Sequence, residues 1–240
     1  SVRIRTVPED SSGMTHMLEH LTLQGSEKYP IKGIFKELSK RSYSNLMNAY
    51  TSRDSTYFPF STTNKKDFMN CLDVYLDCVF HPTLREVDFL TECHHVMFVD
   101  NDPSKELTRG GVVYNEMRGA FSLAPRICAK QITEALFADT PLRYDSGGVP
   151  SDIPKATHER IKRYHETHYN PVNSVFYFYG TFPMEDVFKK VSDVIDQIEV
   201  VEPRDRPEDL VIKPWTETRT IEIEAPADKK EPIEDQYKVE

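Results

Sequence analysis

The sequence predicts an α+β fold, in which a mixed, largely antiparallel sheet is flanked by helices. Runs that alternate between apolar and polar residues, such as residues 1–7, indicate strands, whereas apolar residues three and four positions apart indicate helices. The two kinds of segment are mixed along the chain without the regular strand–helix alternation that is typical of parallel α/β sheets. The 240 residues, of which 38% are hydrophobic, suffice for one large domain or two small ones.

Helices are expected where the apolar residues have helical spacing. The first follows a turn at residues 8–12, and Gly25 can end it because glycine tolerates the left-handed backbone found at helix ends. Asn64 is expected to cap a later helix, because its side chain can accept a backbone hydrogen bond. Beyond the first, the expected helices span residues 33–40, 64–80, 83–99, 104–121, 125–138, 157–168 and 184–198.

Strands are expected where apolar and polar residues alternate. Two of them, residues 44–51 and 55–61, are joined by a short turn, and Pro59 marks an edge or a bulge because it cannot donate to a ladder. Residues 225–240 are charged and interrupted by proline, so we expect a linker or tail there, after one domain at residues 1–224. The expected strands span residues 1–7, 44–51, 55–61, 173–179 and 218–224.

The most informative short motif is H-x-x-E-H, formed by His16, Glu19 and His20. On a helix each residue turns the side chain by about 100 degrees, so histidines four positions apart lie on one face and can reach a single ion. Glu19 borders the same face, where a carboxylate can take a proton from a metal-bound water. The alternative is that both histidines are ordinary polar residues beside an apolar stripe.

A third metal ligand is expected from Glu116, in the run Gly110-Gly-Val-Val-Tyr-Asn-Glu-Met-Arg-Gly119. Apolar residues at helical spacing surround it, so we expect this helix face to be buried. A carboxylate on such a face is costly unless it is paired or bound to metal. With His16 and His20 it would give two imidazoles, one carboxylate and an open position for water, as is typical of catalytic zinc sites.

Further runs along nearly the whole chain accompany the motif. They are Gly25-Ser-Glu-Lys-Tyr-Pro30, Met47-Asn-Ala-Tyr50-Thr51, Tyr57-Phe-Pro-Phe-Ser61, Val74-Tyr-Leu-Asp77, Gly111-Val-Val-Tyr-Asn-Glu116-Met, Ser146-Gly-Gly148 and His168-Tyr-Asn-Pro171. Several long-range runs in the right order are far more specific than one short motif. Together they resemble the insulinase/pitrilysin superfamily of zinc metallopeptidases, and within it the presequence-protease and falcilysin-like branch.

This resemblance implies a role for each motif residue. His16, His20 and Glu116 match the protein ligands of one Zn²⁺ ion, and Glu19 matches the catalytic general base. The family cleaves unfolded peptides, including spent targeting presequences, in the mitochondrial matrix or another organelle lumen.

The resemblance also bears on domain organisation. The enzymes of this family consist of about four similar domains in two halves, which close around the peptide. This chain resembles the first domain, with a preceding strand missing. An Arg and a Tyr from the C-terminal half help to hold the substrate carbonyl, so we expect the chain alone to be inactive without that partner half.

A substrate-binding strand is also implied. In the family, the strand that matches Asn48, Ala49 and Tyr50 lies at a sheet edge beside the zinc, where the peptide adds as an extra strand. The alternative interpretation is an ordinary strand packed in the sheet. Leu23, one turn beyond His20, resembles a position that lines the pocket for the side chain next to the scissile bond.

Composition narrows the classes of partner. The formal net charge is −9, so binding to nucleic acid is not expected. No apolar run approaches the roughly 20 residues of a membrane span. The four cysteines lack C-x-x-C spacing, and Cys71 and Cys78 are expected to be buried core thiols, as in a protein of a reducing compartment.

Histidines outside the motif are expected to be structural. His94 and His95 are adjacent, so on a helix they point about 100 degrees apart and chelate poorly. His165 and His168 have a chelating spacing, but no base or third ligand accompanies them.

Two other functions compete with catalysis for the motif. One is a non-catalytic family subunit, against which the intact motif argues. The other is a zinc site that only stabilises the fold. The substitution Glu19→Gln distinguishes these two functions from catalysis. If Glu19 is a general base, the variant should keep the metal but lose peptide cleavage.

Overall fold

The computed structural model describes residues 1–201, 214–218, 220 and 222. Its central layer is a four-stranded antiparallel sheet with the strand order β3 (Tyr50–Thr51), β4 (Ser55–Phe58), β1 (Val2–Arg5) and β8 (Ser174–Phe176). β1 pairs with β4 on one side and with β8 on the other, so segments far apart in sequence form one sheet. β3 lies at an edge of this sheet.

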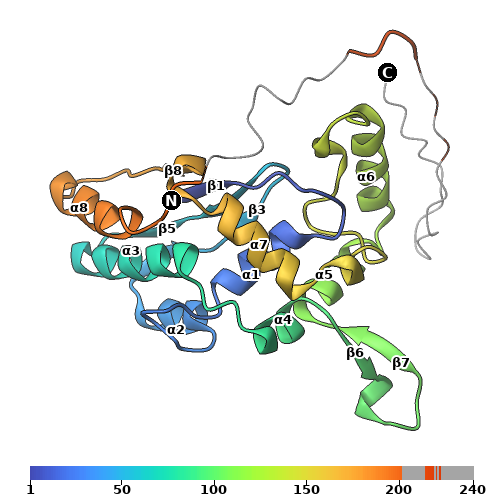
Figure 1. Ribbon diagram of the computed structural model, residues 1–240, viewed down its shortest axis with the longest axis horizontal. Helices are drawn as coiled ribbons and strands as arrows, with labels where there is room; N and C mark the ends of the chain where they lie inside the picture. Colours follow the sequence, from blue (N-terminus) through green and yellow to red (C-terminus); the bar gives the residue numbers. More distant parts are fainter. Residues whose placement is uncertain (202–213, 219, 221, 223–240) are drawn as a thin grey trace.

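Helices pack around this sheet (Figure 1). In the described ranges they are α1 (Met14–Thr22), α2 (Ile34–Arg41), α3 (Lys65–Phe80), α4 (Glu86–Glu92), α5 (Val112–Ala120), α6 (Ala124–Leu136), α7 (His158–His168) and α8 (Met184–Ile195). Helix α1 contacts α4, α5 and α7 as well as β3 and β4, whereas α3 packs against α8. None of these helices has the length and apolar character needed to cross a bilayer. This architecture confirms the predicted α+β class.

The main core lies around α1. Met17, Leu18 and Leu21 of this helix are at most 1% exposed, and they belong to the same cluster as Ile4 and Phe58 of the sheet. Burial of a side chain of this size contributes about 1.5–3 kcal/mol. Every residue of α1 except His20 is buried, so the helix cannot shift without exposing core residues.

Several predicted elements are confirmed. Helices α2, α3, α6, α7 and α8 occupy the predicted segments, and the Asn64 side chain caps α3 by accepting a hydrogen bond from Asp67 N at 3.0 Å. The first helix ends at Thr22, slightly before the predicted Gly25. β8 is shorter than predicted. The strand predicted at 218–224 falls largely on residues outside the described ranges, and so does the tail at 225–240.

The two predicted strands at 44–51 and 55–61 are each broken into two. β2 (Ser44–Met47) pairs with β5 (Phe60–Thr62) in a separate two-stranded ribbon, while β3 and β4 join the main sheet. The break in the second strand falls at Pro59, whose ring nitrogen cannot donate, as predicted for an edge or bulge. The break in the first falls at residues 48–49, beside the site described below.

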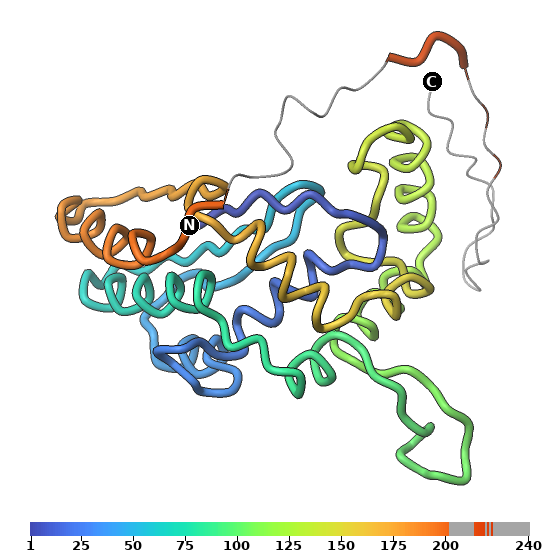
Figure 2. The backbone as a smooth tube through the Cα atoms, in the orientation of Figure 1, coloured from blue at the N-terminus to red at the C-terminus, as the bar shows by residue number. Residues whose placement is uncertain are grey.

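The predictions of helices at residues 83–99 and 104–121 are wrong in part. An antiparallel hairpin of β6 (His95–Phe98) and β7 (Leu107–Gly110) replaces the end of the first and the beginning of the second. The hairpin extends away from the body of the molecule (Figure 2). Its apolar residues are adjacent in β6, so the sequence lacks the clean alternation that predicts a strand.

Gly111 marks the boundary between β7 and α5. Its φ of 125° lies in a region that favours glycine, and a Cβ there would lie 2.4 Å from Cys93 O. The chain can therefore turn from the hairpin into the helix at this glycine. The helical parts that remain of the two predictions are α4 and α5.

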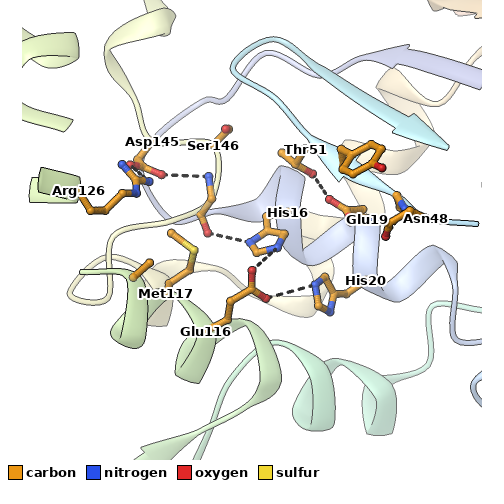
Figure 3. A pocket seen from close by; sticks show the side chains of 14 residues that line it. His16, Glu19, His20, Asn48, Thr51, Glu116, Met117, Arg126, Asp145 and Ser146 are labelled. Carbon is orange, nitrogen blue, oxygen red and sulfur yellow. Dashed lines mark hydrogen bonds and ion pairs between the residues drawn. The ribbon is translucent and has the colours of Figure 1, made fainter. Parts of the chain in front are cut away.

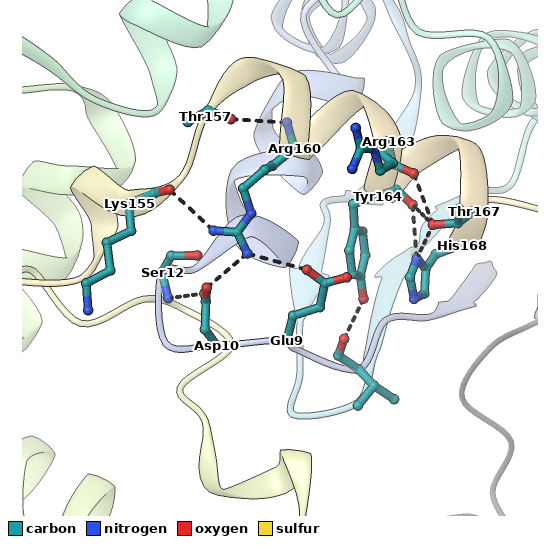
Figure 4. Close-up of polar contacts among 11 residues, drawn as sticks. Glu9, Asp10, Ser12, Lys155, Thr157, Arg160, Arg163, Tyr164, Thr167 and His168 are labelled. Atoms are coloured by element: carbon teal, nitrogen blue, oxygen red, sulfur yellow. Dashed lines mark hydrogen bonds and ion pairs between the residues drawn. The ribbon is translucent and has the colours of Figure 1, made fainter.

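The loop between β1 and α1 is anchored by α7 (Figure 4). Arg160 of α7 forms ion pairs with Asp10 at 2.9 Å and with Glu9 at 3.4 Å. Tyr164 donates its hydroxyl proton to Val7 O at 2.7 Å. These contacts fix the approach to α1, because the loop that α7 holds leads directly into that helix.

The pH dependence of stability should contain a contribution from His165. Burial lowers the pKa of His165 to about 4, and its Nε2–H donates to Val79 O at 2.9 Å. The unfolded chain, in which the histidine pKa is about 6.5, therefore binds a proton before the folded chain does. Below about pH 6.5 we expect the free energy of unfolding to fall by up to roughly 1.4 kcal/mol per pH unit from this residue, down to about pH 4.

Urea unfolding at a series of pH values measures this contribution. The variant His165→Gln has no proton to bind at this position, so its stability should fall less steeply with acid than that of the parent. Identical pH slopes for the two proteins would contradict the assignment.

Candidate metal centre

Helix α1 presents His16, Glu19 and His20 toward one pocket. Gly13 directly precedes the helix and has a left-handed φ of 74°. Its Cα lies so close to the 145–148 loop that a Cβ would be 2.6 Å from Gly147 O. Glycine at this position therefore lets α1 pack directly on that loop.

The two histidines and Glu116 of α5 converge, as Figure 3 shows. His16 Nε2 lies 3.8 Å from Glu116 Oε1, and His20 Nε2 lies 3.8 Å from Glu116 Oε2. One ligand atom from each of the three residues lies within 4.8 Å of the other two. The residues that the structure describes contain no other group of three metal-binding side chains of this kind. The spacing of α1 and the position of α5 thus bring the predicted ligand set together.

Each imidazole is oriented by a partner at Nδ1, the ring nitrogen that does not face Glu116. His16 Nδ1 lies 3.2 Å from Gly147 O, a carbonyl that can only accept, so Nδ1 carries the proton. His20 Nδ1 lies 3.3 Å from Glu92 Oε2 on α4, and Glu92 is only 9% exposed. Both contacts leave Nε2 facing the cluster, which is the arrangement that second partners give to metal-binding histidines.

The loop that orients His16 is held by contacts with α1 and α6 and by a hydrogen bond of its own. Thr15 donates to Ser146 O at 2.9 Å, and Gly147 N donates to Asp145 Oδ1 at 3.1 Å. Asp145, whose side chain is 7% exposed, also forms an ion pair with Arg126 of α6 at 2.5 Å. The Gly147 carbonyl is thereby fixed relative to α1.

Glu19 lies beside the cluster and has its own partner. Thr51 Oγ1 of β3 donates to Glu19 Oε2 at 2.5 Å, and Glu19 is 8% exposed. The other carboxylate oxygen, Oε1, has no hydrogen bond among the described residues. The carboxylate is therefore fixed at one oxygen, and the other is left for a ligand in the pocket.

The pocket has an acidic electrostatic character. Burial alone lowers the pKa of His20, but the hydrogen bond with Glu92 and the charges of Glu19, Glu92 and Glu116 outweigh it and raise this pKa above its ordinary value. The pocket has a volume of about 480 Å³. Its walls include the cluster, Glu19, residues 48–51 and residues 145–147.

The predicted substrate residues lie in different environments. Asn48, Ala49 and Tyr50 line the pocket, and β3 is an edge strand, as the family resemblance implies. Leu23 is 9% exposed, belongs to the main core and is absent from the walls of this pocket. Its predicted role in side-chain recognition stays a prediction.

One argument for the third ligand is wrong. Glu116 was expected on a buried helix face, but its side chain is 54% exposed, and Val112 is 45% exposed. The apolar face of α5 consists of Val113 and Met117 instead. Glu116 lies at the rim of that face, where the pocket admits solvent.

Three further site residues were missed in the sequence. Glu92, Thr51 and Gly147 contact the motif from α4, β3 and a loop. Gly147 and Thr51 lie in runs singled out above, Ser146-Gly-Gly148 and Met47-Asn-Ala-Tyr50-Thr51, but neither run signals the contact itself. Glu92 lies in no such run, and its contact with His20 depends on tertiary packing alone.

The other histidines and cysteines singled out in the sequence make local contacts or pack in the core. His94 Nε2 contacts Ala156 O at 3.0 Å, and His95 Nδ1 contacts Leu90 O at 2.7 Å. His168 is buried and stacks on Tyr164. The predicted core thiols Cys71 and Cys78 are buried and free.

Family comparison assigns the chain to a class. The model of the insulinase family, peptidase family M16, matches residues 5–142, and that of the peptidase M16 inactive domain matches residues 155–239. The chain belongs to the insulinase family of peptidases, family M16. This confirms the resemblance drawn from the motif and the runs around it.

Within the family, the chain is similar to mitochondrial presequence proteases. That of Xenopus tropicalis is 43% identical over 206 residues, which are 85% of this chain and 20% of the relative. That of Mus musculus is 45% identical over 194 residues, which are 80% of this chain and 19% of the relative. The chain thus spans about a fifth of the length of these relatives.

Solved structures share the fold. A protease from Helicobacter pylori matches with a TM-score of 0.68 at 21% identity, covering 88% of this chain and 48% of that one. Pitrilysin matches with a TM-score of 0.64 at 21% identity, covering 85% of this chain and 21% of that one. The likeness confirms a domain of the pitrilysin type.

Removal of the Glu92 carboxylate should weaken metal binding. Glu92→Ala frees His20 Nδ1, and loss of such a partner costs about 10–100-fold in metal affinity. Glu92→Gln should lose less, because its amide oxygen can still accept a hydrogen bond. Competition with a chromophoric chelator, with zinc as the test ion, measures the dissociation constant. The control is Glu86→Gln, exposed on the same helix, and equal affinities for all variants would contradict the role given to Glu92.

Gly13→Ala should destabilise the fold and the site together. The alanine would adopt a left-handed backbone and press on Gly147, at a cost of about 2 kcal/mol or more. Gly33→Ala is a matched control, because Gly33 also precedes a helix with a φ of 68° but has its nearest neighbouring atom at 3.9 Å. Thermal unfolding should show a larger loss for Gly13→Ala, and a similar loss for both would contradict the close packing.

Proposed function

We propose that this chain carries the metal and the general base of a zinc endopeptidase that cleaves unfolded peptides. The observation that carries the proposal is the convergence of His16, His20 and Glu116 beside Glu19, in a pocket bordered by an edge strand. Membership of a peptidase family supports the class of reaction.

Zinc is the ion that the donor set favours. Two imidazole nitrogens and one carboxylate oxygen are a common catalytic zinc set, in which a further position stays open. His16, His20 and Glu116 would hold the ion, and Gly147 O and Glu92 would keep the two rings in place. When bound, zinc supplies Lewis acidity that activates a water and polarises the scissile carbonyl.

Glu19 is proposed to move the proton. Its Oε2 accepts from Thr51, so Oε1 is the atom that takes the proton from the attacking water and then gives it to the leaving amine nitrogen. The burial of Glu19 keeps this exchange away from bulk solvent. Thr51 restricts rotation of the carboxylate between the two transfers.

The peptide is proposed to lie along β3. Tyr50 and Thr51 pair with β4 on one side only, and their other backbone edge faces no strand in the described part of the chain. An extended peptide can add there through backbone hydrogen bonds, which accept many sequences. Because Thr51 also contacts Glu19, a peptide on this strand comes close to the general base.

The relatives suggest the substrate and its location. Their names are those of mitochondrial presequence proteases, which supports cleaved presequences as substrates and the mitochondrion as the compartment. We propose these for a protein of the length of the relatives, in which a second half completes the site. The part represented by this chain supplies the metal ligands and the base.

Glu19→Gln in the whole protein tests the proposal. We expect the variant to keep its zinc, because Glu19 is not a ligand, and to lose about 10²–10⁴-fold in kcat for an unfolded peptide. Metal content is measured by atomic absorption and cleavage by mass spectrometry.

Glu27→Gln is a control, because Glu27 is exposed and lies outside the pocket. The control should cleave like the parent. Cleavage by Glu19→Gln at the parental rate, with zinc retained, would leave only a structural role for the site.

A further inference from the structure

A second, smaller pocket adjoins the metal pocket and is lined by four basic side chains. It holds about 120 Å³ and shares part of its wall, including Arg126, with the metal pocket. Arg53 follows β3, Arg126 and Lys130 lie on α6, and Arg143 ends the 3₁₀ helix η2 (Pro141–Arg143). Such a gathering is unexpected in a chain with a net charge of −9, where acidic residues outnumber basic ones.

The charges in this basic pocket do not balance. Within the described part of the chain, two of its cations have a carboxylate partner and two do not. The pairs are Arg126–Asp145 and Lys130–Glu134. In the described ranges no carboxylate forms an ion pair with Arg53 or Arg143, so the pocket keeps an excess of two positive charges. Like charges held this close repel one another unless an anion lies between them.

Neutral groups hold the two unpaired arginines in place. Arg53 Nη2 donates to Thr133 Oγ1 at 3.1 Å, and its guanidinium lies 5.7 Å from the centre of the Phe137 ring. Arg143 Nη1 donates to Ala138 O at 3.0 Å. These contacts orient both guanidinium groups without neutralising them.

The guanidinium of Arg143 has unused donor capacity. Its Nε is buried and has no hydrogen-bond partner among the described residues. Buried N–H groups without a partner are rare in native structures, so this arginine lacks one acceptor. Guanidinium N–H donors match the geometry of carboxylates and phosphates, and of these two groups an unmodified peptide carries the carboxylate. The volume corresponds to about four waters, which is room for one such group.

We propose that the basic pocket around Arg53, Lys130 and Arg143 binds a carboxylate of the peptide that lies along β3. Arg53 is two residues beyond the end of β3, so a peptide that pairs with this edge strand passes beside it. The carboxylate belongs either to an acidic side chain or to the C-terminus of the peptide. The inference rests on the proposed function in one respect, which is the presence of a peptide on β3.

Binding of matched peptides tests this inference. One pair differs only in a free C-terminal carboxylate against an amide, and an amidated series replaces Gln by Glu at successive positions. Fluorescence anisotropy with the whole protein carrying Glu19→Gln measures affinity while the peptide stays intact. We expect one carboxylate to tighten binding about tenfold, and this gain to shrink between about 50 mM and about 300 mM salt.

Substitutions in the pocket identify the binding groups. In a protein that also carries Arg53→Gln and Lys130→Gln, the gain should fall below about twofold, whereas Arg41→Gln, 80% exposed on α2, should preserve it. Arg143 stays unchanged because of its buried Nε. The inference is overturned if no carboxylate raises the affinity of the peptide more than about twofold, or if no peptide binds. It is also overturned if the gain in affinity survives both substitutions. This experiment measures peptide binding, so its outcome is independent of the Glu19→Gln cleavage experiment that tests the proposed function.

Discussion

The burial of α1 is the constraint on which the site depends. His16, Glu19 and His20 all lie on this helix, which packs against α4, α5, α7 and the sheet. The contacts that stabilise the core therefore also fix the positions of the groups proposed to bind the metal and to transfer the proton. A helix in a mobile loop could carry the same motif, but it could not hold both imidazoles against partners on separate elements.

Local periodicity in the sequence explains how much of the fold and of the candidate site could be predicted. The motif faces one side of a helix because its spacing is helical, and the Asn64 cap follows from residue chemistry alone. The hairpin of β6 and β7 could not be predicted in this way. Among the described residues its two strands pair only with each other, and apolar and polar residues alternate weakly along them. Glu116 was singled out for the wrong physical reason, since it is half exposed, yet the structure places it beside both histidines of the motif.

The contacts that complete the site are tertiary. Glu92 reaches His20 from another helix, and Thr51 reaches Glu19 from the sheet edge. Nothing in the spacing of either residue signals these contacts, because they arise only once α1 is packed. The sequence thus predicts a candidate ligand set, whereas the structure is needed to identify the residues that contact and orient it.

Asp145 connects the two pockets. One of its oxygens accepts from Gly147 N, in the loop whose carbonyl orients His16, and the other pairs with Arg126 in the wall of the basic pocket. Because its side chain is 7% exposed, water screens these interactions weakly. The same carboxylate therefore helps to orient the His16 imidazole and neutralises Arg126. The excess charge of the basic pocket consequently resides on Arg53 and Arg143, which have no such partner among the described residues.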